Sequence, residues 1–331
     1  MCGPIAYQGS KAAMAVLCQA DVVLAIGTRL GPFGKVMQYD FDYWPKAAKF
    51  IQIDLNHRVL GLTQMVDVPI WGGAKACTIA LQRELASDRR EIVAHGNRDE
   101  RLIEVKKRKE EWRSLLDAWT TEGSSSEIRP RQALRELRMA LPEDAVVATD
   151  VGNIASTASA YLEFQQPRSF LAAMSWGNCG YAFPTAIGAK VAQPDRPAIA
   201  IVGDGAWGMS MHEVLTCMRE DIPVTAVVFN NQQWGAEKRN QMDFYAERYV
   251  GTILNSPSFA EIARAMGASA VRIEAIDEIG GALREASQAN QVTVIEIPVS
   301  RDLVEPFRRD ALKRPVRKLP KYKNYGLAET Y

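Results

Sequence analysis

Short apolar runs alternate with amphipathic segments along most of the chain. Runs of strand length occupy residues 21–27, 49–55, 145–150, 198–203, 222–230 and 292–298. Apolar residues recur at helical spacing over residues 12–20, 74–85, 131–141, 181–193, 209–219, 258–266 and 277–289. Strands that alternate with helices predict parallel sheets with crossover helices. We therefore expect an α/β protein made of two doubly wound parallel-sheet domains.

A strongly charged stretch interrupts this rhythm between residues 88 and 128. Its apolar residues recur at helical spacing: Leu102, Val105, Trp112, Leu116 and Trp119. The pattern indicates an amphipathic helix that links two domains.

The charged linker sets the expected domain boundaries. The first domain is expected over residues 1–87, and the second over residues 129–300. Residues 301–331 are expected to form a basic tail, because eight Lys or Arg residues lie between positions 305 and 323. Such a tail is typical of a solvated arm, and it can also bring positive charge to an anionic ligand.

The composition excludes several classes of protein. The chain has 331 residues, of which 47% are hydrophobic and 24% charged, with a formal net charge of +1. This balance gives no global attraction to nucleic acid or membrane, and no apolar run approaches the roughly 20 residues of a membrane helix. Five cysteines without a Cys-x-x-Cys pair favour reduced thiols in a cytoplasmic protein.

The turn at residues 203–208 has two interpretations. Gly203, Gly205 and Gly208 have the spacing of a dinucleotide-binding turn, which would suit an NAD(P)-binding oxidoreductase. Asp204, however, would repel a pyrophosphate unless a cation lay between them. The next strand also ends without the acidic residue that usually holds the ribose. Both features count against the dinucleotide alternative.

A divalent cation reconciles Asp204 with an anionic ligand. Asp204 follows one apolar strand, and Asn231 follows the next. Neighbouring parallel strands lie about 4.8 Å apart, so the two side-chain oxygens can converge on one ion. With a backbone carbonyl just past Asn231, diphosphate oxygens and a water, the set suits Mg²⁺.

At these residues the chain resembles the thiamine diphosphate enzyme family, whose signature is Gly-Asp-Gly followed after about two dozen residues by Asn-Asn. The resemblance implies that thiamine diphosphate is bound through Mg²⁺. By it, the side chains of Asp204 and Asn231 and the carbonyl of Gln233 are metal ligands. It also places Gly203, Gly205, Ala206 and Asn231 at the coenzyme.

Two other strings extend the resemblance. "TDVGN", residues 149–153, is similar to the first diphosphate loop, which implies contacts from Gly152 and Asn153. "SWGNCGYAFPTAIGAK", residues 175–190, is similar to the segment that holds the aminopyrimidine ring, which implies contacts from Gly177, Asn178 and Cys179.

Within the aminopyrimidine segment, two residues have distinct implied roles. Gly177 would accept a hydrogen bond from the 4′-amino group of the coenzyme. Cys179 stands where the family usually has a bulky aliphatic residue that supports the bent coenzyme. A small buried thiol is the alternative interpretation of Cys179.

The resemblance covers nearly the whole chain and also implies an activity. Residues 11–86 resemble the middle domain of the acetolactate synthase and pyruvate oxidase branch. "GTRLGPFG", "NCGYAFP" and the basic tail most resemble enzymes that convert sulfoacetaldehyde and phosphate to acetyl phosphate and sulfite. An acetolactate synthase-like carboligase or decarboxylase is the alternative. The resemblance also implies a homodimer or a homotetramer.

Family members also carry an amino-terminal pyrimidine-binding domain with the glutamate that activates the coenzyme. The chain is therefore expected to be a carboxyl-terminal fragment that binds the coenzyme weakly and does not turn over alone. Trp234 and Phe244 are candidates to shield the cleft. The candidates to bind sulfonate and phosphate are Arg29, Arg239, Arg308 and Arg309.

Overall fold

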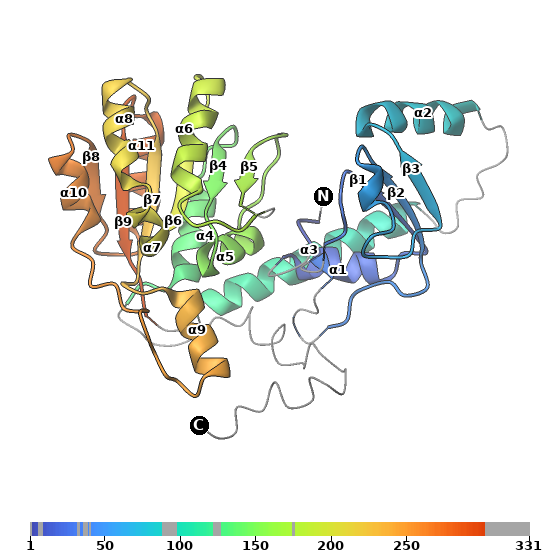
Figure 1. Cartoon of the computed structure of the whole chain (residues 1–331), viewed down its shortest axis with the longest axis horizontal. Helices are drawn as coiled ribbons and strands as arrows, with labels where there is room; N and C mark the ends of the chain where they lie inside the picture. The colour runs from blue at the N-terminus through green and yellow to red at the C-terminus, as the bar shows by residue number, and fades with distance from the viewer. Residues whose placement is uncertain are drawn as a thin grey trace. The chain divides into compact units, whose positions relative to one another are not determined.

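A computed structural model describes residues 2–5, 9–31, 34–35, 39, 41–87, 98–121, 127–173 and 176–301 (Figure 1). The described residues divide into two compact units, the first ending at Leu115 and the second beginning at Leu116. The expected basic tail beyond Arg301, including Arg308 and Arg309, lies outside the described residues, as do residues 88–97 and 122–126 of the expected linker.

The first unit is built on a three-stranded parallel sheet in the order β1-β2-β3. Its elements are α1 (Lys11–Cys18), β1 (Val22–Ile26), β2 (Lys49–Asp54), the 3₁₀ turn η2 (His57–Val59), β3 (Val68–Trp71), α2 (Ala74–Ser87) and α3 (Arg98–Thr121). The side chain of Ser10 caps α1 by accepting a hydrogen bond from the amide of Ala13. Ala25, Leu30 and Phe50 form its small core.

The second unit is built on a six-stranded parallel sheet in the order β5-β4-β6-β7-β9-β8. Its first half comprises α4 (Pro130–Ala140), β4 (Val146–Thr149), α5 (Asn153–Tyr161), β5 (Phe170–Ala172), α6 (Ala182–Ala192), β6 (Ala198–Gly203) and α7 (Asp204–Gly208). Its second half comprises η3 (Met211–Glu213), α8 (Val214–Arg219), β7 (Thr225–Asn230), α9 (Gly235–Phe244), α10 (Phe259–Ala265), β8 (Ser269–Arg272), α11 (Glu278–Gln288) and β9 (Thr293–Pro298).

The strand order reverses between β4 and β6. From β4 the chain moves outward to β5, and it then returns to the other side of β4 to form β6. In open parallel sheets, the crevice beyond the carboxyl ends of strands at such a reversal is the usual place for a ligand. The segments at the carboxyl ends of β4 and β6, residues 150–153 and 203–206, include the expected diphosphate contacts.

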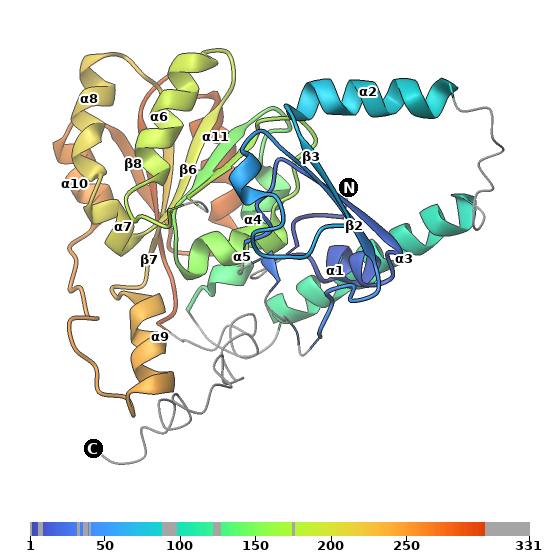
Figure 2. The same ribbon diagram turned by 45° about the vertical axis from the view of Figure 1, so that its right-hand side comes forward.

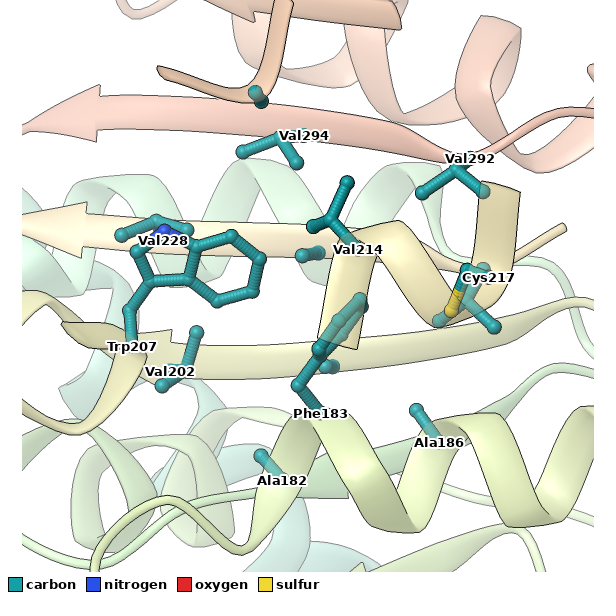
Figure 3. Packing of buried hydrophobic residues seen from close by; sticks show 14 of the residues in the cluster. Ala182, Phe183, Ala186, Val202, Trp207, Val214, Cys217, Val228, Val292 and Val294 are labelled. Atoms are coloured by element: carbon teal, nitrogen blue, oxygen red, sulfur yellow. The ribbon is translucent and has the colours of Figure 1, made fainter. Parts of the chain in front are cut away.

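Helices cover both faces of this sheet. The helices α6, α8 and α10 pack on one face, where alternate residues of β6, Ala198, Ala200 and Val202, join a buried cluster. The rings of Phe183 and Trp207 meet edge to face in this cluster, with centroids 4.9 Å apart (Figure 3). Such burial on both faces explains why the strands appear in the sequence as continuous apolar runs.

The expected fold class is confirmed, since both sheets are parallel and helices are interleaved with their strands. The single helix that was expected over residues 209–219 is not formed; the 3₁₀ turn η3 and the short helix α8 occupy most of this segment. The sequence pattern also did not indicate β3, β5, β8, α5 or α9. These elements are short, or they carry little apolar periodicity.

The charged helix expected near residues 88–122 is α3, and it belongs to both units. Residues up to Leu115 lie in the first unit, and Leu116 begins the second. Trp112 and Leu116 are buried. No helix in the described part of the chain has both the length and the apolar character needed to cross a membrane.

Candidate functional site

The segments expected to bind the coenzyme follow three adjacent strands of the second unit. β4 pairs with β6 with Thr149 opposite Ile201, and β6 pairs with β7 with Gly203 opposite Phe229. All three strands run in parallel, so their carboxyl ends share one edge of the sheet. The structure thus brings residues 150–153, 203–206 and 231–233 to that edge.

Asp204 carries an unsatisfied buried oxygen. Asp204 is the first residue of α7 and is 3% exposed. Its Oδ1 accepts a 2.9 Å hydrogen bond from the amide of Gly205. The other carboxylate oxygen, Oδ2, is buried without a hydrogen-bond partner among the described residues. A buried carboxylate oxygen without a partner is costly unless a ligand satisfies it. Asp204 therefore has the chemistry of a cation ligand.

Burial raises the pKa of Asp204 to about 6, and backbone amides oppose this shift. The opposing amides are those of Gly205, Gln232 and Gln233. Independently of the pKa, β6 and β7 are paired with Gly203 opposite Phe229, so Asp204 and the turn after β7 lie at the same edge of the sheet. This is the relationship that a shared cation between Asp204 and Asn231 requires.

Two consecutive side chain–backbone turns shape the loop after β7. Oδ1 of Asn230 accepts a 3.2 Å hydrogen bond from the amide of Gln232, and Oδ1 of Asn231 accepts one of the same length from the amide of Gln233. The backbone of Gln232 adopts the left-handed conformation, with φ of 53°. The carboxamide oxygen of Asn231 retains a second lone pair for a cation.

The side chain of Gln233 is engaged at both ends. Nε2 donates to the carbonyl of Arg301 at 2.8 Å, and Oε1 accepts from Nζ of Lys238 at 2.9 Å. The residue is 2% exposed. The ammonium of Lys238 at Oε1 would repel a cation there, so the backbone carbonyl is the oxygen that Gln233 can offer to a cation.

Trp234 packs directly over the glycine that follows Asp204. A Cβ atom on Gly205 would lie 2.7–2.8 Å from the ring atoms of Trp234. Only glycine lets this backbone and the indole approach so closely. The indole thus lies beside the residue that follows Asp204.

Gly152 forms the turn between β4 and α5. It is the N-cap of α5 with φ of 95° and ψ of −162°, a conformation that is essentially restricted to glycine. The turn directs the amino end of α5, which begins at Asn153, toward the carboxyl edge of the sheet. Helix amino termini favour negative charge, which suits a diphosphate nearby.

Asp150 is a buried site residue that the sequence analysis missed. Oδ1 accepts from the amides of Val151 and Gly180 at 3.0 and 3.1 Å, and Oδ2 accepts from Ala182 at 2.8 Å. Burial raises the pKa of this carboxyl, and the amides act in the opposite direction. One side chain thus joins the loop after β4 to the segment before α6. Its only sequence signal was its place within "TDVGN".

The segment expected at the aminopyrimidine ring is partly described. Gly177 is exposed with φ of 73°, and its amide donates to the carbonyl of Ala173 at 2.9 Å. Asn178 is also exposed. Cys179 is half-buried against the core cluster. Burial raises the pKa of its thiol most, and the negative charges of Asp150 and Glu237 raise it further. The role of Cys179 beside the coenzyme stays a prediction.

Helix α9 lies beyond the carboxyl ends of β6 and β7 in both views (Figures 1 and 2). It carries Arg239, which is 5% exposed, and Phe244, which is 46% exposed. Arg29, another candidate for anion binding, lies exposed in the first unit. Arg239 is therefore the candidate arginine that the structure describes in the same unit as Asp204.

The residues present suit a cation whose coordination shell is completed by ligands from outside the chain. Within the described residues, no three His, Cys, Asp or Glu side chains gather to hold a metal ion. Asp204 instead offers one free carboxylate oxygen beside a loop of amide and carbonyl oxygens. This hard oxygen set suits Mg²⁺ held jointly with diphosphate oxygens.

Models of known protein families match both units. Residues 1–81 match the central domain of thiamine pyrophosphate enzymes. Residues 150–297 match the C-terminal TPP binding domain of thiamine pyrophosphate enzymes. The second match includes residues 203–208, so these glycines belong to a thiamine pyrophosphate domain and not to a dinucleotide-binding oxidoreductase.

Several curated relatives align along almost the whole chain. The sulfoacetaldehyde acetyltransferases of Castellaniella defragrans and Alcaligenes xylosoxydans xylosoxydans are 54% and 51% identical to it, each over 98% of this chain and 57% of the relative. A probable acetolactate synthase large subunit of Methanocaldococcus jannaschii is 32% identical over 97% of this chain and 54% of the relative. The chain thus spans little more than half the length of these relatives. It belongs to the thiamine pyrophosphate enzyme family, and it contains the central and C-terminal domains of that family.

Proposed function

We propose that the chain is the central and coenzyme-binding part of an acetyltransferase that converts sulfoacetaldehyde and phosphate to acetyl phosphate and sulfite. The observation that carries this proposal is 54% and 51% identity to two sulfoacetaldehyde acetyltransferases along 98% of the chain. Identity to the acetolactate synthase relative is 32% along a similar length. The coenzyme is thiamine diphosphate, held through Mg²⁺.

The unsatisfied oxygen of Asp204 supports the cation part of this proposal. Asp204 and Asn231 would bind Mg²⁺ through their side chains, and Gln233 through its carbonyl. Gly203, Gly205, Ala206, Gly152 and Asn153 would contact the diphosphate, whose negative charge the amino ends of α7 and α5 favour. When bound, the coenzyme supplies the carbon nucleophile and electron sink that acetyl transfer from an aldehyde requires.

The protein's own residues have three further tasks in this reaction. Asp150 fixes the loop after β4 relative to the segment of Gly177, Asn178 and Cys179. The diphosphate would contact the loop and the aminopyrimidine ring would contact the segment, so Asp150 would keep these two binding surfaces at a constant distance. Trp234 shields the Gly205 backbone from water, which matters because water would compete with phosphate for the acetyl group. Arg239 is the proposed source of positive charge for an anionic substrate.

Product analysis tests the proposed substrate. The chain, supplied with thiamine diphosphate, Mg²⁺ and the part of the Castellaniella relative that lies outside the alignment, is incubated with sulfoacetaldehyde and phosphate. We expect acetyl phosphate and sulfite in equal amounts, and no activity when that added part is omitted. Formation of acetolactate from pyruvate, without sulfite release from sulfoacetaldehyde, would favour the acetolactate synthase-like alternative.

The assembly and the location of the protein complete the proposal. We propose a homodimer or homotetramer in the cytoplasm. All five cysteines are free thiols, which supports a reducing compartment. Light scattering of the reconstituted protein would measure the assembly.

A further inference from the structure

The last strand of the large sheet contains a buried glutamate with no role in the site described above. Glu296 is 0% exposed, in the strand "TVIEIP", whose other residues are apolar apart from Thr293. A carboxylate buried to this extent is retained only when it is fully hydrogen-bonded. Its surroundings therefore indicate what it holds in place.

Four groups donate hydrogen bonds to this carboxylate. Oε1 accepts from Nη1 of Arg272 at 2.7 Å and from Nδ2 of Asn230 at 2.8 Å. Oε2 accepts from Oγ of Ser258 at 2.8 Å and from the amide of Ala260 at 2.9 Å. Glu296 thus connects strand β8, the start of α10 and the end of β7.

The bond to Asn230 fixes which way its carboxamide faces. A carboxylate only accepts hydrogen bonds, so the NH₂ group of Asn230 must point toward Glu296. The carboxamide oxygen then points away, and it accepts the amide of Gln232 at 3.2 Å. Asn230 is 5% exposed, so water offers little alternative for either end.

The loop after β7, residues 230–233, carries the proposed cation ligands and is called the cation loop here. The amide that donates a hydrogen bond to Asn230 belongs to Gln232, the strained residue of this loop. Gln232 is left-handed with φ of 53°, which is unfavourable for a residue with a long side chain. Its two chain neighbours, Asn231 and Gln233, are the proposed cation ligands after β7. A hydrogen bond that holds Gln232 in this conformation therefore also sets where the oxygens of Asn231 and Gln233 point.

We propose that Glu296 and Asn230 form a positioning pair that holds the cation loop in its binding conformation before the cation arrives. Glu296 orients the carboxamide of Asn230, and Asn230 in turn holds the amide of Gln232. This inference deepens the proposed function and rests on it for the identity of the cation. Residues that support metal ligands in this way commonly change metal affinity about 10–100-fold when they are replaced.

The test compares Asn230→Ala with Ser258→Ala as a matched control. Both substitutions remove a 2.8 Å hydrogen bond to the same carboxylate, but only the first removes a contact to the loop. Thiamine diphosphate binding is measured by calorimetry at increasing Mg²⁺ concentration. We expect Asn230→Ala to raise the half-saturating Mg²⁺ concentration about tenfold, with binding restored at high Mg²⁺, and Ser258→Ala to change it less than about twofold.

Two results would overturn the positioning role. One is a half-saturating Mg²⁺ concentration for Asn230→Ala within about twofold of the wild type. The other is an equal change in Ser258→Ala, which would indicate a general effect of loosening Glu296. Should Asn230→Ala not fold, Asn230→Ser serves instead, because its hydroxyl accepts the Gln232 amide only weakly and does not extend to Glu296. An increase of about threefold or more is then expected, and a smaller one contradicts the proposal.

Hydrogen exchange of the ligand-free chain separates this inference from the proposed function. We expect the amide of Gln232 to exchange about tenfold faster in Asn230→Ala, and at the wild-type rate in Ser258→Ala. Unchanged exchange in Asn230→Ala would overturn the positioning role, whatever the chain binds. A wild-type chain that binds no thiamine diphosphate at any Mg²⁺ concentration would instead overturn the proposed function.

Discussion

Oδ2 of Asp150 accepts a 2.8 Å hydrogen bond from the backbone amide of Ala182. This bond connects the turn after β4 to the first residue of α6. Because the side chain is 2% exposed, the connection is shielded from water. The segment between them carries Gly177, Asn178 and Cys179, so Asp150 limits how far that segment can move from the turn at Gly152.

Replacement of Asp150 by asparagine is expected to destabilise the protein. One carboxylate oxygen becomes an NH₂ group, which faces a backbone amide and leaves that amide unsatisfied. The expected loss in the free energy of unfolding is about 1–3 kcal/mol. Urea unfolding measures it, with Asp195→Asn at an exposed position as the control, expected to change stability by less than about 0.5 kcal/mol. Equal stabilities for the two variants would contradict the bracing role of Asp150.

Gly205→Ala is expected to force the indole of Trp234 out of place. The new Cβ would lie 2.7–2.8 Å from ring atoms of Trp234, which is too close for any real contact. Overpacking of this kind costs about 1–3 kcal/mol. In thermal unfolding, the matched control Gly208→Ala should show little loss, because a Cβ there meets no atom within 4 Å. Adding Trp234→Ala to Gly205→Ala should restore part of the loss, and a double variant as unstable as the sum of the singles would refute the contact.

Gly152→Ala and Gly188→Ala are expected to change stability in opposite directions. Gly152 has φ of 95°, which strains any residue with a Cβ, so alanine there should cost about 1–3 kcal/mol. Gly188 lies inside α6, and a Cβ there meets no atom within 4 Å, so alanine should stabilise by about 0.5–1 kcal/mol. Chemical unfolding compares the two. Stabilisation by Gly152→Ala would show that the turn is not held as described.

The raised pKa of Asp204 predicts a pH dependence of the metal-free chain. The carboxyl keeps its proton up to about pH 6 in the folded protein, whereas the unfolded chain releases it near the ordinary value of 3.8. Stability from this group is therefore full below about pH 4 and is lost as pH rises to about 6. At about 1.4 kcal/mol per pH unit, the loss is about 3 kcal/mol.

The comparison of wild type with Asp204→Asn in EDTA isolates this titration from that of other carboxyl groups. The difference between their unfolding free energies should change between pH 4 and pH 6 and be flat at higher pH. A difference that is constant over this range would contradict the buried, unpaired carboxyl. Added Mg²⁺ with thiamine diphosphate should offset the wild-type loss, since a cation favours the ionised form.

The sequence was most informative where an apolar strand ends in a distinctive turn. The six-residue strand β6 was predicted with the bounds that the structure has, and the position of Asp204 after it follows directly. The adjacency of β6 and β7 was also expected, and their parallel pairing confirms it. The Gly152 turn at the reversal between β4 and β6 could be placed because "TDVGN" follows an apolar run.

Contacts between residues that are distant in the sequence could not be predicted. Asp150 and Ala182 are separated in the sequence by α5, β5 and the loops that flank them, and no local pattern connects the two residues. Glu296 likewise interrupts an apolar strand, and its partners Asn230, Ser258 and Arg272 come from three other elements. The helix α5 was missed because its small and polar residues give it little apolar periodicity. Its formation depends on packing against α4 and the sheet.

The central claim is that Asp204 binds thiamine diphosphate through a divalent cation. Calorimetric titration of thiamine diphosphate into the wild-type chain and into Asp204→Ala, each with Mg²⁺ and with EDTA, tests this claim most directly. The wild-type chain is expected to bind thiamine diphosphate when Mg²⁺ is present, and affinity for the coenzyme should be at least about tenfold weaker in EDTA or in Asp204→Ala. Equal affinity for thiamine diphosphate in EDTA, or in Asp204→Ala, would contradict it.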